Sequence, residues 1–398
     1  MLLRMVSDVP VGIFLSGGID SSSLVALLSR KHPNLSTFSV VFKELDYSEA
    51  QYSRSISKRF GTDHHEIVIS CHDVMTSLPK IIGAMDQPTV DGVNTYIISR
   101  ETRRIGYKVA LSGLGADEIF AGYETFKTVP RMEWFAWCAS TIKPTLRHML
   151  ASIISVAISK RRPRAEKLAV LIEGDGSIPH PYALARMLFM PRQLRQLSLV
   201  SDGMHVDPAM APLADILKWA ERFDPVNRTS YLELRHYMPN TLLRDSDFMS
   251  MAHGLELRVP FVDHKLAEFL FRIPGASKLK RGLPKWLLIE AVQGLLPEQV
   301  VHRPKRGFTF PFELWLKKEM RQDMEDVLLD TSANLLAGVD RKFVATVWKD
   351  FLAGKTTWSR PWSLYVLNQW VDMFLESRPA SSAVDIPELG RHQAMARN

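Results

Sequence analysis

Residues 11–23, VGIFLSGGIDSSS, constrain the fold of this chain more than any other part of its sequence. A short apolar run ends abruptly at Ser16-Gly17-Gly18, and a helical pattern begins after Asp20. An apolar run of this length is typical of a buried strand, and glycines permit the tight turn that returns the chain as a helix. The segment therefore predicts a strand, a turn large enough to hold a phosphate group, and a helix.

The predicted turn has the chemistry of an anion site. Backbone N–H groups of Gly17 and Gly18 can approach a phosphate closely, and the hydroxyls of Ser16 and Ser21 add donors at the start of the helix. The carboxylate of Asp20 would repel phosphate unless a Mg²⁺ ion lay between them. The loop lacks the lysine of a G-x-x-x-x-G-K-[ST] loop, which argues against a kinase or GTPase site. We expect phosphate and Mg²⁺ here, with a plain tight connection as the alternative.

The alternation of strand and helix continues through residues 11–122 and predicts an α/β fold. Near-continuous apolar strands separated by helices indicate a parallel sheet flanked by helices, whose ligands bind beyond the carboxyl ends of the strands. We expect strands at residues 11–15, 37–42, 64–69 and 107–113, and helices at 22–30, 48–60 and 73–84.

Length and pattern divide the chain into four parts. A chain of 398 residues is too long for one small core. Residues 1–123 are expected to form the α/β core, and residues 236–376 a mostly helical part that completes the active site. Residues 124–235 are interpreted as a variable helical insertion without recognisable chemistry, and residues 377–398, which lack periodicity, as a mobile tail.

Composition narrows the partners and the compartment. The net charge of +7 permits a nucleotide or a nucleic acid as partner, but the basic run at residues 159–167 is more typical of a solvated surface, so no nucleic acid is expected. Cys71 and Cys138 provide neither a disulfide framework nor a zinc pattern, which favours the cytoplasm. The apolar stretch at residues 151–159 is too short for a membrane span.

A second glycine-rich turn, LSGLGADE, follows the fourth expected strand. Because parallel strands end at the same edge of a sheet, Asp20 and Asp117 could hold one Mg²⁺ ion between them. Ser112 and Gly113 would then contact the nucleotide. The alternative is that Asp117 and Glu118 only cap the N-terminus of a helix.

Together with two further segments, these turns resemble the synthetase domain of the asparagine synthetase family, a branch of the ATP pyrophosphatase (PP-loop) enzymes. The segments are RDSDFMSMAHGLELRVPFVDH at residues 244–264 and RPKRGFTFPFELWL at residues 303–316. The resemblance runs in family order from residue 7 to about residue 316, with a weak middle. It implies an enzyme that cleaves ATP between the α and β phosphates.

The resemblance also implies roles for individual residues. It places adenosine on Leu15 and Val40, the nucleotide on Ser112 and Gly113, pyrophosphate and Mg²⁺ on Ser16, Gly17, Gly18, Asp20 and Ser21, and a second metal ligand at Asp117.

Lys305 is the expected catalytic residue. A lysine in a loop bounded by Pro304 and Gly307 can reach a cleft filled with phosphates, neutralise charge that develops on the α-phosphate, and stabilise the tetrahedral adduct formed by ammonia. A surface lysine is the alternative.

The block LELRVPFVDH places charged residues in an apolar frame. Because unpaired charge is costly there, we expect Glu256, Arg258 and Asp263 to form a structural ion-pair network that supports the cleft.

The expected activity is that of an asparagine synthase-like, ATP-dependent amide ligase. It would activate a carboxylate, aspartate or a related acid, as an acyl-AMP with release of pyrophosphate, and ammonia or an amine would then displace AMP. A tRNA-modifying PP-loop ligase and a catalytically degenerate scaffold subunit are the alternatives. The retention of Asp20, Asp117 and Lys305 favours an enzyme.

Two departures from the family pattern bear on the substrates. The family's glutaminase domain begins with a nucleophilic cysteine after Met1, whereas residue 2 is leucine. The chain is therefore a fragment, a synthetase that uses free ammonia, or one served by a separate glutaminase chain. Leu114 stands where asparagine synthetases usually carry glutamate in S-G-x-G, and Thr241 falls where an acidic residue is common. A pocket lined by hydrophobic residues, for an acid other than free aspartate, is therefore expected.

Overall fold

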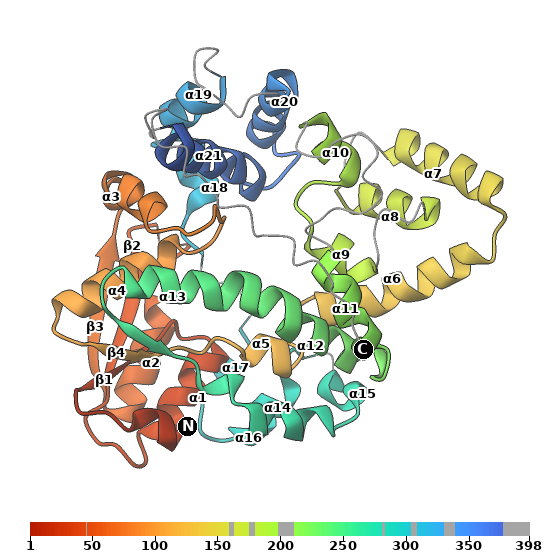
Figure 1. The fold of residues 1–398 in the computed structure, drawn as a ribbon. Helices are drawn as coiled ribbons and strands as arrows, with labels where there is room; N and C mark the ends of the chain where they lie inside the picture. Colours follow the sequence, from red (N-terminus) through yellow and green to blue (C-terminus); the bar gives the residue numbers. More distant parts are fainter. Residues whose placement is uncertain are drawn as a thin grey trace, which may run out of the picture.

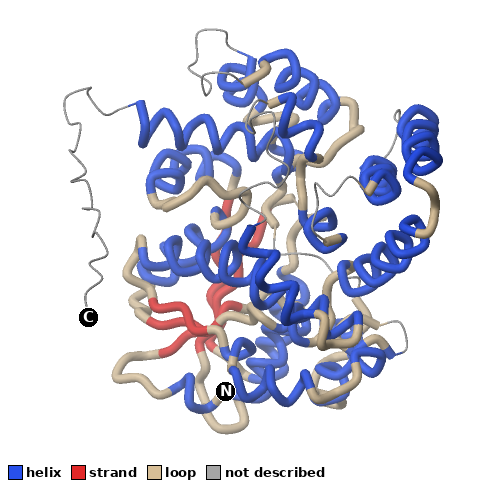
Figure 2. Tube along the Cα trace, turned by 45° about the vertical axis from the view of Figure 1, so that its right-hand side comes forward, coloured by secondary structure: helices blue, strands red, loops and turns tan. Residues whose placement is uncertain are grey.

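The computed structural model describes residues 1–44, 46–158, 163–174, 180–197, 211–280, 283–303, 309–329 and 339–376. At its centre, five strands lie in the order β3-β2-β1-β4-β5, and every neighbouring pair is parallel (Figure 2). The strands are β1 (Val11–Phe14), β2 (Ser36–Phe42), β3 (Asp63–Ile69), β4 (Val109–Leu111) and β5 (Glu256–Arg258). The predicted α/β fold with a parallel sheet and flanking helices is confirmed.

Four helices connect the first four strands, and the first three begin and end close to the predicted positions. They are α1 (Ile19–Leu28), α2 (Ala50–Phe60), α3 (Cys71–Gly83) and α4 (Val93–Arg104). Sequence analysis did not anticipate α4. Its sequence, VNTYIISRETRR, mixes polar and apolar residues, yet Val93 and Ile97 are buried on one face. Packing on the sheet and on α13 (Leu243–Met251) therefore defines this helix more clearly than its composition does.

Strand β5 was also not predicted. Its residues come from the LELRV segment and extend the sheet next to β4, with Val109 opposite Glu256 and Leu111 opposite Arg258. The chain therefore leaves the sheet after β4 and rejoins it at the neighbouring position. Of the described elements between these two strands, α13 packs back on α4 and β5.

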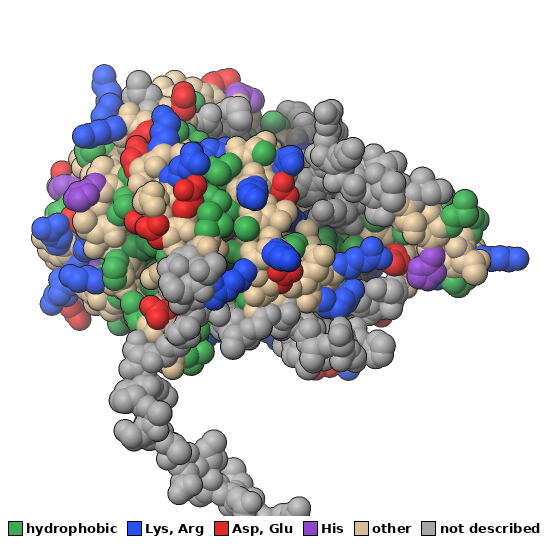
Figure 3. All heavy atoms as spheres, turned by 90° about the horizontal axis from the view of Figure 1, so that it is seen from above, with side chains coloured by type: hydrophobic (Ala, Val, Ile, Leu, Met, Phe, Trp, Pro, Cys, Tyr) green, Lys and Arg blue, Asp and Glu red, His purple; other side chains and the backbone are tan. Residues whose placement is uncertain are grey.

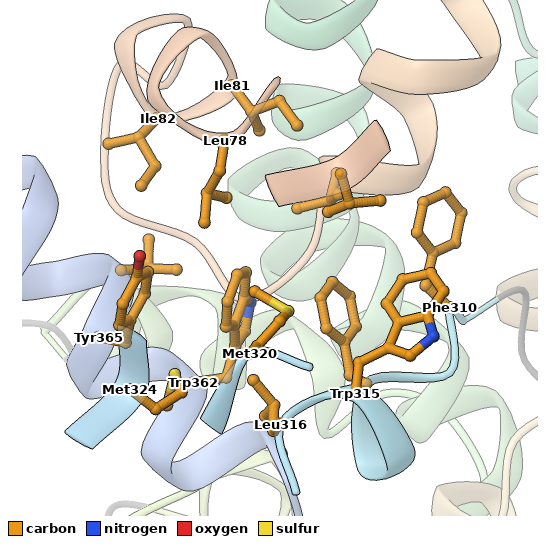
Figure 4. Packing of buried hydrophobic residues seen from close by; sticks show 14 of the residues in the cluster. Leu78, Ile81, Ile82, Phe310, Trp315, Leu316, Met320, Met324, Trp362 and Tyr365 are labelled. Atoms are coloured by element: carbon orange, nitrogen blue, oxygen red, sulfur yellow. The ribbon is translucent and has the colours of Figure 1, made fainter. Parts of the chain in front are cut away.

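Each face of the sheet packs on its own hydrophobic core. On one face, Phe38 and Val40 of β2 belong to a cluster with α3, α4 and the C-terminal helices, part of which Figure 4 shows around Trp315 and Trp362. On the other face, Ile13 of β1 packs with residues of α1 and later helices. The alternating direction of strand side chains explains the two clusters.

The helices added by the second half of the chain are α14 (His264–Phe271), α15 (Gly275–Lys278), α16 (Trp286–Ala291), α17 (Glu298–Val301), α18 (Phe312–Trp315), α19 (Arg321–Leu329), α20 (Arg341–Leu352) and α21 (Ser359–Val371).

The described parts of the excursion between β4 and β5 are helices joined by turns and short loops. Its last part, from Pro225 to Met251, is one continuous rod in which the π-helix η3 joins α12 to α13. The elements are α5 (Ala116–Ile119), α6 (Thr125–Ser140), α7 (Pro144–Ile158), α8 (Pro163–Glu173), α9 (Pro181–Arg186), α10 (Pro191–Gln196), α11 (Ala211–Ala220), α12 (Pro225–Leu232) and η3 (Glu233–Leu242). Short helical segments elsewhere are η1 (Leu2–Met5), η4 (Pro260–Val262) and η6 (Asp372–Glu376).

Helices α6 and α7 form an arm that extends away from the sheet (Figure 1). Hydrophobic side chains lie on the surface of this arm, seen at the right of Figure 3, and Trp134, Trp137 and Met149 are exposed. Within the described parts of the chain, no helix has both the length and the apolar character needed to cross a bilayer. The tail predicted at residues 377–398 lies outside the described residues.

Candidate active site

The turn after β1 brings its backbone to the N-terminus of α1. Gly17 has φ of 74°, and a Cβ at this position would lie 2.5 Å from Cβ of Tyr52, so the turn requires glycine. The N–H of Gly18, the N-cap residue of α1, donates to Ser16 Oγ at 3.2 Å, and the hydroxyls of Ser16 and Ser21 lie 3.3 Å apart. Backbone and hydroxyl donors thus gather at one helix N-terminus, as an anion requires.

The turn after β4 packs directly against the first turn. A Cβ on Gly113 would lie 2.9 Å from Cβ of Asp20 and 3.0 Å from the backbone nitrogen of Ser21. The Ser112 N–H donates to the carbonyl of Arg258 at 2.9 Å and so ties the turn to β5. This close approach places the carboxylates of Asp20 and Asp117 side by side.

A lysine that sequence analysis did not single out joins these carboxylates. Lys285 Nζ lies 2.5 Å from Asp20 Oδ2 and 2.9 Å from Asp117 Oδ1, and its side chain is 6% exposed. Lys285 has φ of 58°, a left-handed conformation, immediately before α16. Burial alone would lower the pKa of the Lys285 ammonium, but the attraction of Asp20 and Asp117 outweighs it and raises the pKa. The lysine therefore acts as a fixed positive charge between two strand ends.

The same two carboxylates fit a Mg²⁺ ion. Asp20 and Asp117 already share one cation, and carboxylate oxygens are the ligands that Mg²⁺ prefers in proteins. Among the described residues, no group of three or more histidine, cysteine or acidic side chains forms a metal site, so water and phosphate oxygens would complete the coordination. An ion at this position would take over some of the attraction that Lys285 now satisfies.

One cavity of about 410 Å³ collects nearly all the predicted site residues. Gly17 does not line the cavity. The carbonyl of Gly17 accepts a hydrogen bond from Arg303 at 3.3 Å. Lys305 lies outside the described residues, so its role stays a prediction. The predicted residues that line the cavity are Leu15, Ser16, Gly18, Asp20, Ser21, Val40, Ser112, Gly113 and Asp117.

The part of the cavity beyond Asp117 has a mixed wall. Leu114 and Leu242 line it, as a hydrophobic pocket requires, but so do Asp91, Glu118 and Asp245. Hydrophobic residues line the pocket as expected, acidic residues that were not expected lie beside them, and the identity of the acid stays a prediction. The acidic side chains come from parts of the fold that the family comparison did not consider: the residue before the N-cap of α4, α5 and α13.

All three of these carboxyl groups have a raised pKa. Burial, with the nearby charge of Asp117, raises the pKa of Glu118 to about 7. Burial also raises the pKa of Asp245 to about 7, with a further contribution from Asp91, although a hydrogen bond from Thr89 opposes the shift. The pKa of Asp91 is raised by burial as well. This wall is thus an environment in which negative charge is poorly compensated.

Two tyrosines beside these carboxylates are held by an arginine from the insertion. Tyr123 donates to Glu118 Oε1 at 2.7 Å, and both Tyr123 and Tyr237 line the cavity. The guanidinium of Arg186, at the end of α9, lies 3.7 Å from the ring centre of Tyr237 and 4.8 Å from that of Tyr123. Glu233, fully buried, pairs with Arg186 at 2.5 Å. The insertion, interpreted from sequence as lacking chemistry, therefore shapes the pocket.

The charges of the LELRVPFVDH block are paired, as predicted, but they form two separate pairs away from the cavity instead of one network that supports the cleft. Arg258 binds Glu256 at 2.8 Å, and its Nη1 donates to the carbonyls of Arg4 and Val6. Asp263 lies 3.5 Å from Arg4 and caps α14. The pairs hold the N-terminal segment against β5; from this block, only Leu257 lines the cavity.

Comparison with known proteins agrees with this geometry. The sequence model of the asparagine synthase family matches residues 2–372. Asparagine synthetase (glutamine-hydrolyzing) 1 of Bacillus subtilis is 32% identical over 383 residues, which cover 94% of this chain and 58% of that protein. Asparagine synthetase (glutamine-hydrolyzing) 3 of the same organism is 30% identical over 323 residues, covering 77% of this chain and 46% of the relative. Amidase chyE of Penicillium rubens is 26% identical over 381 residues, which cover 85% of this chain and 55% of that protein.

The chain belongs to the asparagine synthase family. It spans less than two thirds of the length of each of these relatives.

Proposed function

We propose that the chain is an ATP-dependent amide ligase that activates a carboxylic acid as its acyl-adenylate. The observation that carries the proposal is the contact between the two glycine-rich turns, which brings Asp20 and Asp117 onto a single cation at the wall of a cavity. Family membership supports it, because the curated relatives include asparagine synthetases. The overall reaction would consume carboxylate, ATP and ammonia or an amine, and would yield amide, AMP and pyrophosphate.

The first half-reaction would take place beyond the carboxyl ends of β1 and β4. Ser16, Gly18 and Ser21 offer donors to the β and γ phosphates at the start of α1, and Leu15 and Val40 offer apolar surface to the adenosine. A carboxylate oxygen of the substrate would attack the α-phosphorus, and the bond to the bridging oxygen of pyrophosphate would break. The donors at the turn are positioned to stabilise the departing pyrophosphate.

Asp20 and Asp117 would hold the Mg²⁺ ion, which supplies charge neutralisation on the phosphates when bound. Lys285 keeps the two carboxylates together and supplies a further positive charge at the same edge of the sheet. Lys305, on the expectation from the family resemblance, would stabilise charge at the α-phosphate.

In the second half-reaction, the nitrogen of ammonia or an amine would attack the acyl carbon. The bond between acyl carbon and adenylate oxygen would break, AMP would leave with the electron pair, and the nitrogen would lose a proton. Glu118 and Asp245, with pKa values of about 7, could exist with or without a proton near neutral pH, so either could accept that proton. The nitrogen donor would be free ammonia, an amine, or ammonia from a glutaminase.

Pyrophosphate release from MgATP, measured across a panel of carboxylic acids, tests the proposal. Release that depends on both an acid and Mg²⁺, together with AMP formation when ammonia is added, is the expected result. Absence of release with every acid would instead support a degenerate scaffold, and release only with added tRNA would support a tRNA-modifying ligase. The Asp20→Asn variant is the negative control for contaminating ATPases.

A further inference from the structure

We infer that the wall formed by Asp91, Glu118 and Asp245 recognises a cationic amine on the carboxylic acid substrate, and that this acid carries no second carboxylate beside the amine. The inference rests on the proposed activation reaction for the identity of the reacting group. The recognition of the amine rests on the wall itself.

The three carboxylates come from separate segments of the chain but line the same cavity. Thr89 Oγ1 donates to Asp245 Oδ2 at 2.8 Å and accepts the N–H of Asp91 at 3.2 Å, so one hydroxyl links two of them. The side chains of Asp91 and Glu118 both interact electrostatically with Tyr237, and Asp91 also interacts with Asp245. Helix α13, which carries Asp245, lies beside α4 in Figure 1, and Asp91 comes directly before the N-cap of α4, so both aspartates line the cavity.

One carboxylate oxygen of Glu118 receives no hydrogen bond from the described residues. Its side chain is 0% exposed, and only Oε1 receives a hydrogen bond, from Tyr123. Among the described residues, no donor reaches Oε2, although Glu118 lines the cavity. A buried carboxylate oxygen without a partner is costly. Because Glu118 is closed to solvent, a positive charge in the cavity would offset its charge without contacting Oε2.

The charge of the wall selects a cation over a neutral donor. Two described arginines act on the wall, Arg186 on Asp91 and Arg244 on Asp245, and each is already paired, with Glu233 and with Asp86. Of the other described cations at the cavity, Lys285 binds Asp20 and Asp117, and Arg303 binds Glu49. Three acidic groups thus face the pocket without a dedicated positive partner in the part of the chain that the structure describes. An ammonium guest would offset this charge, whereas a hydroxyl would leave it in place.

The same reasoning disfavours a second carboxylate near the amine. Such a group would meet Leu114, Leu242 and the three acidic side chains, where repulsion and desolvation oppose it. The inferred substrate class is therefore an amino acid in which the amine stands apart from any carboxylate except the one that is activated.

The test compares four acids of similar size: 4-aminobutyrate, 4-hydroxybutyrate, butyrate and aspartate. Pyrophosphate release by the wild-type chain should show kcat/KM for 4-aminobutyrate at least about tenfold above each of the others. In Asp245→Asn and Asp91→Asn this preference should fall by about tenfold, with the KM for ATP unchanged. The exposed Asp63→Asn is the matched control and should retain the preference. A preference for butyrate, for the hydroxy acid or for aspartate would overturn the inference.

Binding of n-butylamine separates this inference from the proposed reaction. In the absence of ATP, the amine should raise the melting temperature of the wild-type chain more than n-butanol does, and Asp245→Asn should abolish the difference while its circular dichroism stays native. Amine binding without pyrophosphate release from any acid would uphold the amine site and refute the ligase. Release with neutral acids and no amine binding would uphold the ligase and refute the amine site.

Discussion

Lys285 Nζ lies 2.5 Å from Asp20 Oδ2 although 265 positions separate the two residues in the chain. This contact joins the first strand end to a segment that follows the fifth strand, and Asp117 closes the group at 2.9 Å. The ion-pair group of Lys285, Asp20 and Asp117 is therefore assembled from three segments that are far apart in the sequence. The first two predictions test what each member contributes.

Replacement of either carboxylate should remove the metal-dependent reaction. In Asp20→Asn and Asp117→Asn, one oxygen ligand for Mg²⁺ becomes an amide, so Mg²⁺-dependent pyrophosphate release should fall by about a hundredfold or more. Pyrophosphate assays over a range of Mg²⁺ concentrations measure the effect. Asp63→Asn, an exposed change in β3, should match the wild type. Retention of activity in either test variant would refute the shared metal site.

Lys285→Gln should destabilise the chain in EDTA, because two neighbouring carboxylates lose their common cation. The expected loss is about 3 kcal/mol in the free energy of unfolding. Added Mg²⁺ should restore more stability to this variant than to the wild type, because the ion then has no competing ammonium. Denaturant unfolding with and without Mg²⁺ measures both effects, and Lys218→Gln, a surface change, is the control. An equal response to Mg²⁺ in variant and wild type would contradict the idea that lysine and metal share these ligands.

Arg186→Lys should weaken binding of the carboxylic acid and leave ATP binding unchanged. The change keeps the charge beside Glu233 but removes the planar group that lies on Tyr237. We expect KM for the acid to rise by about three- to tenfold and KM for ATP to stay constant. In Arg222→Lys, which removes a similar contact with the exposed Trp219, both constants should be those of the wild type. A parallel change in both KM values would point to a general loss of structure.

Lys278 should be a source of instability at neutral pH. Its side chain is fully buried, and burial lowers its pKa to about 8, although Asp224 opposes the shift. The unfolded chain therefore binds the proton more tightly, so the stability of the wild type should rise as pH increases from about 8 to about 10.5.

Lys278→Met should remove this pH dependence and raise stability at pH 7 by roughly 3 kcal/mol. Denaturant unfolding at pH 7 and pH 10 measures the difference, with Lys318→Met as a surface control. A destabilised Lys278→Met would show that the ammonium has a compensating role.

The sheet and the first strand-end residues could be predicted because their signals are local. Apolar runs that end in glycine and serine mark buried strands and their turns, and the parallel arrangement places Asp20 and Asp117 at one edge. The boundaries shifted by a few residues. Helix α1, for example, begins at Ile19 because the turn itself supplies the first helical residues.

The rest of the site could not be predicted because its residues carry no local pattern. Lys285 precedes an ordinary apolar helix, and only the tertiary fold directs its side chain to Asp20. Asp91 and Asp245 meet because α4 packs on α13, a contact between segments far apart in the chain. A family comparison at Leu114 showed which acidic residue is absent, but could not show which others take its place.

The pairing of Val109 with Glu256 has a consequence for how such a chain can change. The long helical excursion leaves the carboxyl end of β4 and returns at the start of the neighbouring parallel strand, so the two strands can stay paired when the part between Tyr123 and α12 changes in length. Arg186, Tyr237 and Asp245 all lie within it, whereas Asp20 belongs to the frame. If the proposed function holds, an exchange of the excursion beyond Tyr123 between related chains would transfer the choice of acid and leave the proposed phosphate site unchanged.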